Sequence, residues 1–220
     1  MRRLLAAFFL LLAAFWSNSA NAQSPGILYD NGLACPGYCH DAWQINDGYV
    51  VTDSFFVNTS VRVTGFDFWS WEFPNDRVLR VQWSISSDPF GGTIFGSGSA
   101  LVHDQFLAVN EYGFDIDQVT VTGLDVSLPR GRYWITLQNV VDEQHSPVYW
   151  DENSGQGCHS LGCPSTAFEN QLGTIPSETF DVRGVHLPGA SGQTKAPASP
   201  SSVLWVPLLI GLAVSLRPKL

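Results

Sequence analysis

Alternating apolar and polar residues run through the body of this chain and constrain its fold more than any other feature. In the segment 78–86, the apolar residues of one strand face are Leu79, Val81, Trp83 and Ile85. The segment 133–137 repeats the pattern, with Trp134 on the opposite face. This period of two is that of a half-buried β-strand, and no part of the body shows a sustained helical period.

Turn-forming residues separate the expected strands. Gly, Pro, Asn and Asp gather at 46–48, 73–76, 88–92, 129–131 and 153–155. We expect strands over 49–57, 60–71, 78–86, 93–102, 114–121, 133–137, 147–150 and 179–185. Short strands at this spacing predict an all-β fold, an antiparallel β-sandwich or jelly roll.

The N-terminus has the three parts of a secretory signal peptide. Arg2-Arg3 precedes an apolar run over 4–16, and the small residues of Ala20-Asn21-Ala22 follow. The apolar run is shorter than the roughly 20 residues that span a bilayer, which disfavours a retained anchor. We therefore expect residues 1–22 to be a signal peptide and the mature protein to be exported.

Composition divides the mature chain into a body and a tail. Residues 23–190 suit one β-sandwich domain. Residues 191–202 are rich in Pro, Ser and Ala, which predicts an extended linker. Residues 203–220 are apolar with a basic end, which predicts a C-terminal hydrophobic helix that anchors or sorts the protein at a membrane.

The body is acidic and contains no lysine. All 20 Asp and Glu of the chain lie between Asp30 and Asp181. The basic residues of the body are Arg62, Arg77, Arg80, Arg130, Arg132 and Arg183. Binding to nucleic acid requires clustered Lys and Arg that displace counterions from phosphates. Because no such cluster exists, we exclude nucleic acid as a partner.

Four cysteines remain after the signal peptide, namely Cys35, Cys39, Cys158 and Cys163. In an oxidising compartment an even number of cysteines predicts disulfides. The local pairs Cys35–Cys39 and Cys158–Cys163 are preferred, with bridges between the two loops as the other pairing. A histidine follows Cys39 and another follows Cys158, so a zinc site is the alternative, although the gaps match zinc motifs only loosely.

Eight short stretches and the layout of the tail carry a family resemblance. The stretches are 28–32 (LYDNG), 41–46 (DAWQIN), 51–55, 65–74, 81–85, 133–139, 148–155 and 175–180. With the linker, hydrophobic segment and basic end, they resemble an uncharacterised group of secreted Gram-negative proteins that carry the PEP-CTERM sorting signal. The resemblance implies association with the cell envelope and no particular activity. Residues 196–200 read APASP and lack the family's Glu, which argues against recognition by an exosortase-type sorting enzyme.

Three tryptophans are candidates for a carbohydrate-binding surface. Trp69 and Trp71 share a strand face, opposite Phe68 and Ser70, and Trp150 precedes two acidic residues. Exposed aromatic rings stack on sugar rings, whereas buried ones fill a core. An exposed row would predict binding of an extracellular polysaccharide.

Carboxylate and amide oxygens are also candidates for a structural calcium site. The predicted ligands are Asp115, Asp117, Asp151, Glu152 and Asn153. Calcium takes six to eight oxygen ligands from such groups. Asp151 and Glu152 are adjacent on an expected strand and point to opposite faces, so they make a poor acid–base pair for glycoside hydrolysis.

These patterns favour an exported, non-enzymatic β-sandwich that binds carbohydrate or an exopolysaccharide matrix at the cell envelope. No nucleophile, metalloprotease, phosphate-loop or dinucleotide motif occurs. The alternatives are a secreted polysaccharide hydrolase and a purely structural surface protein. Two carboxyl groups facing one cleft would favour hydrolysis, and an exposed Trp row without them would favour binding.

Overall fold

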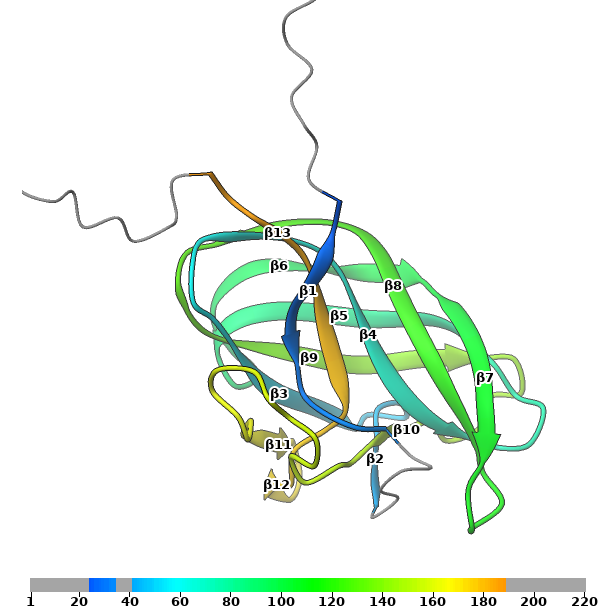
Figure 1. Cartoon of the computed structure of the whole chain (residues 1–220). Helices are drawn as coiled ribbons and strands as arrows, with labels where there is room; N and C mark the ends of the chain where they lie inside the picture. Colours follow the sequence, from blue (N-terminus) through cyan, green and yellow to red (C-terminus); the bar gives the residue numbers. More distant parts are fainter. Residues whose placement is uncertain (1–23, 35–40, 189–220) are drawn as a thin grey trace, which may run out of the picture.

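Two antiparallel β-sheets packed face to face make up the computed structural model, which describes residues 24–34 and 41–188 (Figure 1). The prediction of an all-β fold is confirmed. Within these ranges no helix is long and apolar enough to cross a membrane. The predicted signal peptide 1–22, the linker and the hydrophobic tail lie outside the described residues, as do Cys35 and Cys39.

The larger sheet contains seven strands. They are β1 (Gly26–Asp30), β2 (Ala42–Gln44), β4 (Val61–Glu72), β7 (His103–Val109), β8 (Asp115–Leu128), β10 (Tyr149–Asp151) and β13 (Phe180–His186). β4 lies at the centre, with β8 along one edge and β13 followed by β10 along the other. β7 extends the sheet beyond β8, and β1 pairs with β13.

The second sheet contains six strands. Their order is β12 (Gly173–Ile175), β11 (Ala167–Glu169), β3 (Val50–Val57), β9 (Gly131–Asp142), β5 (Val78–Asp88) and β6 (Gly91–Leu101). In Figure 1 these strands run behind the seven-stranded sheet and cross its strand direction.

The inner faces of the two sheets form the hydrophobic core. Phe66 and Phe68 of β4 are fully buried and lie opposite Val121 and Val119 of β8. Trp83 of β5 packs edge-to-face on Phe66, with 6.3 Å between ring centroids. Burial of each such side chain contributes about 1.5–3 kcal/mol, so contacts of this kind hold the sheets together.

Each strand expected from the sequence is present, with its ends shifted by a few residues except where β8 and β9 extend further. One facing was wrong: Leu79 was expected to point inward and is 43% exposed. The pairing of β5 with β9 shifts register between Val78 and Arg80, and Val78 occupies the core in its place.

A disulfide joins Cys158 and Cys163 in the loop between β10 and β11. Their Cα atoms are 6.0 Å apart, within the range of an ordinary disulfide. The predicted local pairing is confirmed for these two cysteines, which excludes a zinc site on their thiolates.

Candidate functional site

The last four residues of β4 alternate between the two faces of the seven-stranded sheet. Trp69 and Trp71 point outward and belong to a separate hydrophobic cluster on the outer face. Ser70 and Glu72 point inward, opposite Asp117 and Asp115 of β8. The prediction that Trp69 and Trp71 share a face is confirmed. This end of β4 therefore carries aromatic residues on one side and acidic residues on the other.

The outer side bears a group of packed rings that we call the aromatic surface, formed by Trp69, Trp71, Phe73, Tyr112, Phe114 and Tyr149. Trp71 stacks on Tyr112 at a centroid distance of 5.7 Å, and Phe114 lies 5.9 Å from Trp71. Phe114 also meets Phe73 at 5.2 Å and Tyr149 at 5.9 Å. Tyr112 is 61% exposed, so the cluster reaches the solvent.

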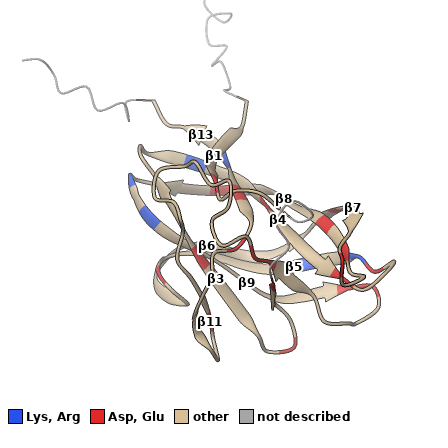
Figure 2. Ribbon diagram, turned by 60° about the horizontal axis from the view of Figure 1, so that its bottom comes forward, with Lys and Arg blue, Asp and Glu red and all other residues tan. Residues whose placement is uncertain are grey.

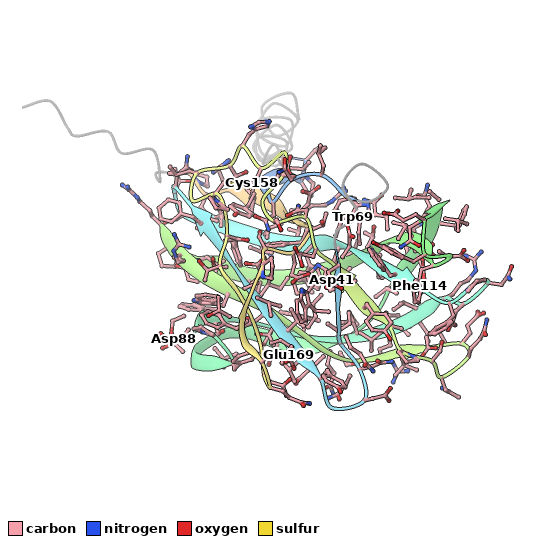
Figure 3. All side chains as sticks on the ribbon, turned by 90° about the horizontal axis from the view of Figure 1, so that it is seen from below. Asp41, Trp69, Asp88, Phe114, Cys158 and Glu169 are labelled. Atoms are coloured by element: carbon pink, nitrogen blue, oxygen red, sulfur yellow. A yellow bond between two sulfur atoms is a disulfide. The ribbon has the colours of Figure 1, made fainter. Side chains whose placement is uncertain are left out.

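A shallow groove crosses this surface. It has a volume of about 130 Å³ and is lined by Asp41, Ala42, Trp71, Phe114 and Tyr149. Figure 3 labels Asp41 and Phe114, which line this groove, and Trp69. Asp41 is exposed, and its carboxyl group supplies hydrogen-bond acceptors beside the rings.

Amide side chains continue the same face beside Trp69, which is half-buried. Gln118 of β8 pairs with Trp69, and Gln105 of β7 pairs with Gln118. Residues directly opposite each other in neighbouring strands point to the same side of a sheet. Gln118 therefore lies next to Trp69 and Gln105 lies one strand further out, and both amides donate and accept hydrogen bonds.

Trp150 does not belong to this surface, which corrects its assignment to a ligand site. Its side chain has 0% exposure and lies between Phe68 and Phe180, at centroid distances of 6.2 and 5.7 Å. The indole N–H donates to the carbonyl of Thr179 at 2.8 Å. Because no atom of Trp150 is accessible, its role is to fill the core.

The inner side of the same sheet end holds an acidic cluster formed by Glu72 of β4, Asp104 of β7 and Asp117 of β8. One carboxylate oxygen from each lies within 4.8 Å of the other two. Across residues 24–34 and 41–188, no other set of three His, Cys, Asp or Glu converges in this way. Burial, reinforced by the neighbouring carboxylates, raises the pKa of Glu72 to about 9 and that of Asp117 to about 8.

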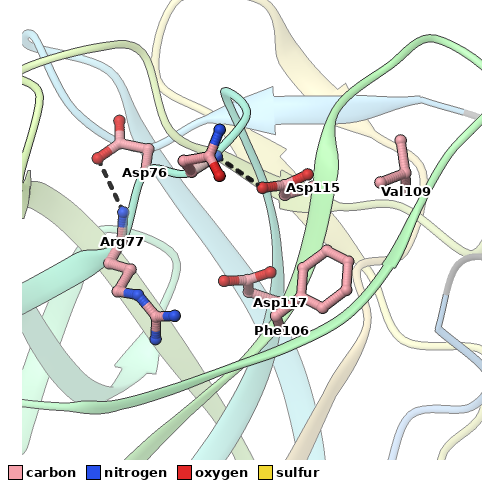
Figure 4. A pocket seen from close by; sticks show the side chains of 7 residues that line it. Asp76, Arg77, Phe106, Val109, Asp115 and Asp117 are labelled. Carbon is pink, nitrogen blue, oxygen red and sulfur yellow. Dashed lines mark hydrogen bonds between the residues drawn. The ribbon is translucent and has the colours of Figure 1, made fainter.

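A pocket of about 440 Å³ opens on Asp117 from the solvent side. Figure 4 shows Asp115 and Asp117 projecting into it from β8, with Arg77 on the facing wall. Asp115 is anchored there, because its carboxylate accepts the backbone N–H of Asn75 at 2.8 Å. Phe106 and Val109 line the remaining side.

The five predicted calcium ligands do not meet at one point, so that site is corrected. Asp151 lies on the other side of β4, where its carboxylate accepts the indole N–H of Trp71 at 2.7 Å. The Glu152 carboxylate accepts from Ser154 at 2.6 Å, and Asn153 bonds to the backbone of Asn31 and of Gly155. Only Asp117 belongs to a converging group, and its partners Glu72 and Asp104 were missed.

Charge and comparison with known proteins add little further guidance. Acidic residues occur on both sheets (Figure 2), and within the described ranges two arginines form ion pairs, Arg62 with Asp125 and Arg183 with Asp67. Searches against protein families and against curated proteins find no match. Function is therefore inferred from the geometry of the aromatic surface and of the acidic cluster.

Proposed function

We propose that this protein is an exported, non-enzymatic β-sandwich that binds polysaccharide through its aromatic surface at the cell envelope. The observation that carries the proposal is the half-buried Trp69, which shares one sheet face with the neighbouring Gln118, with Gln105 beyond it, and with Trp71 of the groove.

The chemistry of a sugar chain matches this face. The C–H groups of a pyranose ring pack on aromatic rings, while its hydroxyls bond to planar amides and carboxylates. The aromatic surface supplies rings, and Gln118, Gln105 and Asp41 supply polar groups at its margin. Each ring contact contributes only about 0.5–1.5 kcal/mol, so useful affinity requires several sugar units of one polymer.

Fold and chain layout support the cellular part of the proposal. The strand orders β1-β13-β4-β8 and β3-β9-β5-β6 support a jelly roll, an architecture that occurs in lectin domains. The Cys158–Cys163 disulfide suits an oxidising compartment outside the cytoplasm. Residues 203–220 are the segment proposed to hold the protein at the membrane, in line with the resemblance to PEP-CTERM proteins.

Polysaccharide hydrolysis is the weaker candidate. Asp115 and Asp117 do line one pocket, as a pair of catalytic carboxylates would. Asp117 is only 2% exposed, however, and its oxygen lies within 4.8 Å of oxygens from Glu72 and Asp104. Glycosidase carboxyl pairs stand about 5–9.5 Å apart around an accessible bond, which this buried group does not provide.

Replacing Trp69 by alanine is expected to weaken polysaccharide binding at least about tenfold, because about 1.4 kcal/mol of stacking and packing is lost. The purified protein is first screened on a glycan array, and affinities for the best polymer are then measured by calorimetry. Gln118→Ala is expected to weaken binding in the same direction by removing the adjacent amide.

Phe90→Ala is the matched control, since Phe90 is an exposed aromatic residue at the turn between β5 and β6 of the other sheet. It should bind as the unaltered protein does. Full affinity in Trp69→Ala would show that the polysaccharide binds elsewhere on the protein. Release of new reducing ends from the polymer would favour the hydrolase. Absence of binding to any glycan would favour a purely structural role.

A further inference from the structure

The three carboxylates of the acidic cluster are oriented so that each presents one oxygen to a shared point. The Ser70 hydroxyl donates to Oε1 of Glu72 at 2.6 Å, and the Val78 N–H donates to Oδ2 of Asp104 at 2.6 Å. Oε2 of Glu72 and Oδ1 of both Asp104 and Asp117 are buried and have no hydrogen-bond partner within the described part of the chain. The neutral donors therefore hold Glu72 and Asp104 in place, and each of the three carboxylates keeps one buried oxygen without a hydrogen-bond partner.

Such an arrangement is unfavourable without a positive charge. Glu72 is fully buried and Asp117 nearly so, and a buried carboxylate without a partner costs several kcal/mol in lost hydration. Repulsion among three of them adds to that cost. Arg77 is the basic residue of the neighbouring pocket, but none of its nitrogens lies within 4.0 Å of these carboxylates, so it does not form an ion pair with them.

We propose that Glu72, Asp104 and Asp117 bind a single Ca²⁺ ion. Ligands that are all carboxylate oxygens select hard cations such as Ca²⁺ and Mg²⁺ over Zn²⁺ or Cu²⁺. The three oxygens lie within 4.8 Å of one another, so one Ca²⁺ with bonds of about 2.4 Å can contact all of them. Mg²⁺ dehydrates reluctantly and is usually held by one or two carboxylates, so a set of three carboxylates favours Ca²⁺.

The adjoining pocket completes the coordination. Calcium takes about six to eight oxygens, and three carboxylates supply between three and six of them. The pocket of about 440 Å³ reaches Asp117 and has room for the water molecules that fill the remaining positions (Figure 4). It also gives the ion a path from the solvent to Asp117.

The ion would join three strands at one end of the sandwich, since the ligands come one each from β4, β7 and β8. Glu72 directly follows Trp71, which faces the opposite side of the sheet. Calcium would thus stabilise the end of β4 that carries the aromatic surface. The inference does not depend on glycan binding, because it is tested without any sugar.

Calcium binding is tested on the whole protein after removal of metal with a chelator. Calorimetric titration with CaCl₂ should show one site, and the melting temperature should rise by several degrees at saturating calcium. MgCl₂ should bind at least about tenfold more weakly. Asp117→Asn should abolish both the heat and the calcium-dependent rise in melting temperature.

Two further observations separate ligand loss from misfolding. Without calcium, Asp117→Asn should melt at or above the temperature of the unaltered protein, because asparagine cannot place a charge among the buried carboxylates. Asp125→Asn changes an exposed residue of the same strand and should leave calcium binding intact. The proposal is overturned if millimolar calcium neither releases heat nor raises the melting temperature, if Asp117→Asn keeps the response, or if Mg²⁺ binds equally well.

Discussion

Replacing Trp150 by alanine is expected to lower the free energy of unfolding by about 3–5 kcal/mol, the range for large aromatic residues of a packed core. The substitution opens a cavity between Phe68 and Phe180, which the two sheets cannot close without moving β4 or β13. It also removes the indole N–H that bonds to the carbonyl of Thr179. The lost packing and the lost hydrogen bond both lower the free energy of unfolding, because the ring and its N–H are buried at the same point.

Chemical unfolding followed by circular dichroism measures this loss, with Trp69→Ala as the matched control. Trp69 is half-buried on the outer face, so its removal should cost less than half as much. Trp150→Phe should fall between the two, since it keeps a ring and loses the hydrogen bond. Equal losses from Trp150→Ala and Trp69→Ala would contradict the distinction between a core tryptophan and a surface one.

These tryptophans show what alternation along a strand can predict and what it cannot. Alternation along β4 correctly placed Trp69 and Trp71 on one face and Phe68 on the other. Both faces of β4 are apolar, so alternation alone cannot say which one is covered by the second sheet. The facing of Trp150 was still harder to predict, because β10 has only three residues and its orientation follows from pairing with Ser70 of β4.

The acidic cluster shows the same limit for a site. Nearness in sequence suggested that Asp115 and Asp117 act together with the run 151–153. Strand register instead brings Asp117 beside Glu72 of β4 and Asp104 of β7, two residues that lie on other strands. The inward position of Glu72, in step with Phe66 and Phe68, was the available signal, since a charged residue on a core face requires a partner.

The strands β1, β2, β7, β11 and β12 were missed because they are short or alternate weakly.

A second buried polar group makes the stability of the fold depend on pH. Oδ2 of Asp53 accepts the N–H of Glu178 and the hydroxyl of Ser165, each at 2.8 Å, and the Asn31 amide at 3.3 Å. Burial raises the pKa of Asp53 to about 7, even though these hydrogen bonds act in the opposite direction. Burial also raises the pKa of Glu178 well above its usual range, and both of its carboxyl oxygens have no partner within the described residues. The ionisable groups around the pair are Tyr29, Asp30, Asp41, Arg132, Asp151 and Glu152.

The sign of the effect follows from where the proton is held. An unfolded Asp loses its proton near pH 4, whereas Asp53 in the folded protein keeps it until about pH 7. The stabilisation is therefore complete below about pH 4 and is lost progressively as the pH rises to about 7. Over that window the expected loss from this residue is on the order of a few kcal/mol. The protein should accordingly melt at a higher temperature at pH 5 than at pH 7.5.

Asp53→Asn tests the assignment, because asparagine keeps an acceptor for Glu178 N–H but cannot ionise. Its melting temperature should fall less between pH 5 and pH 7.5 than that of the unaltered protein. Asp125→Asn removes an exposed ion pair with Arg62 and should leave the pH dependence unchanged over the same range. The hydrogen bond from Arg62 lowers the pKa of Asp125, so this residue loses its proton below pH 5. The calcium concentration is the same for all variants, so that any contribution of the acidic cluster to the pH dependence is common to them. The same slope in Asp53→Asn as in the unaltered protein would show that Asp53 does not carry the effect.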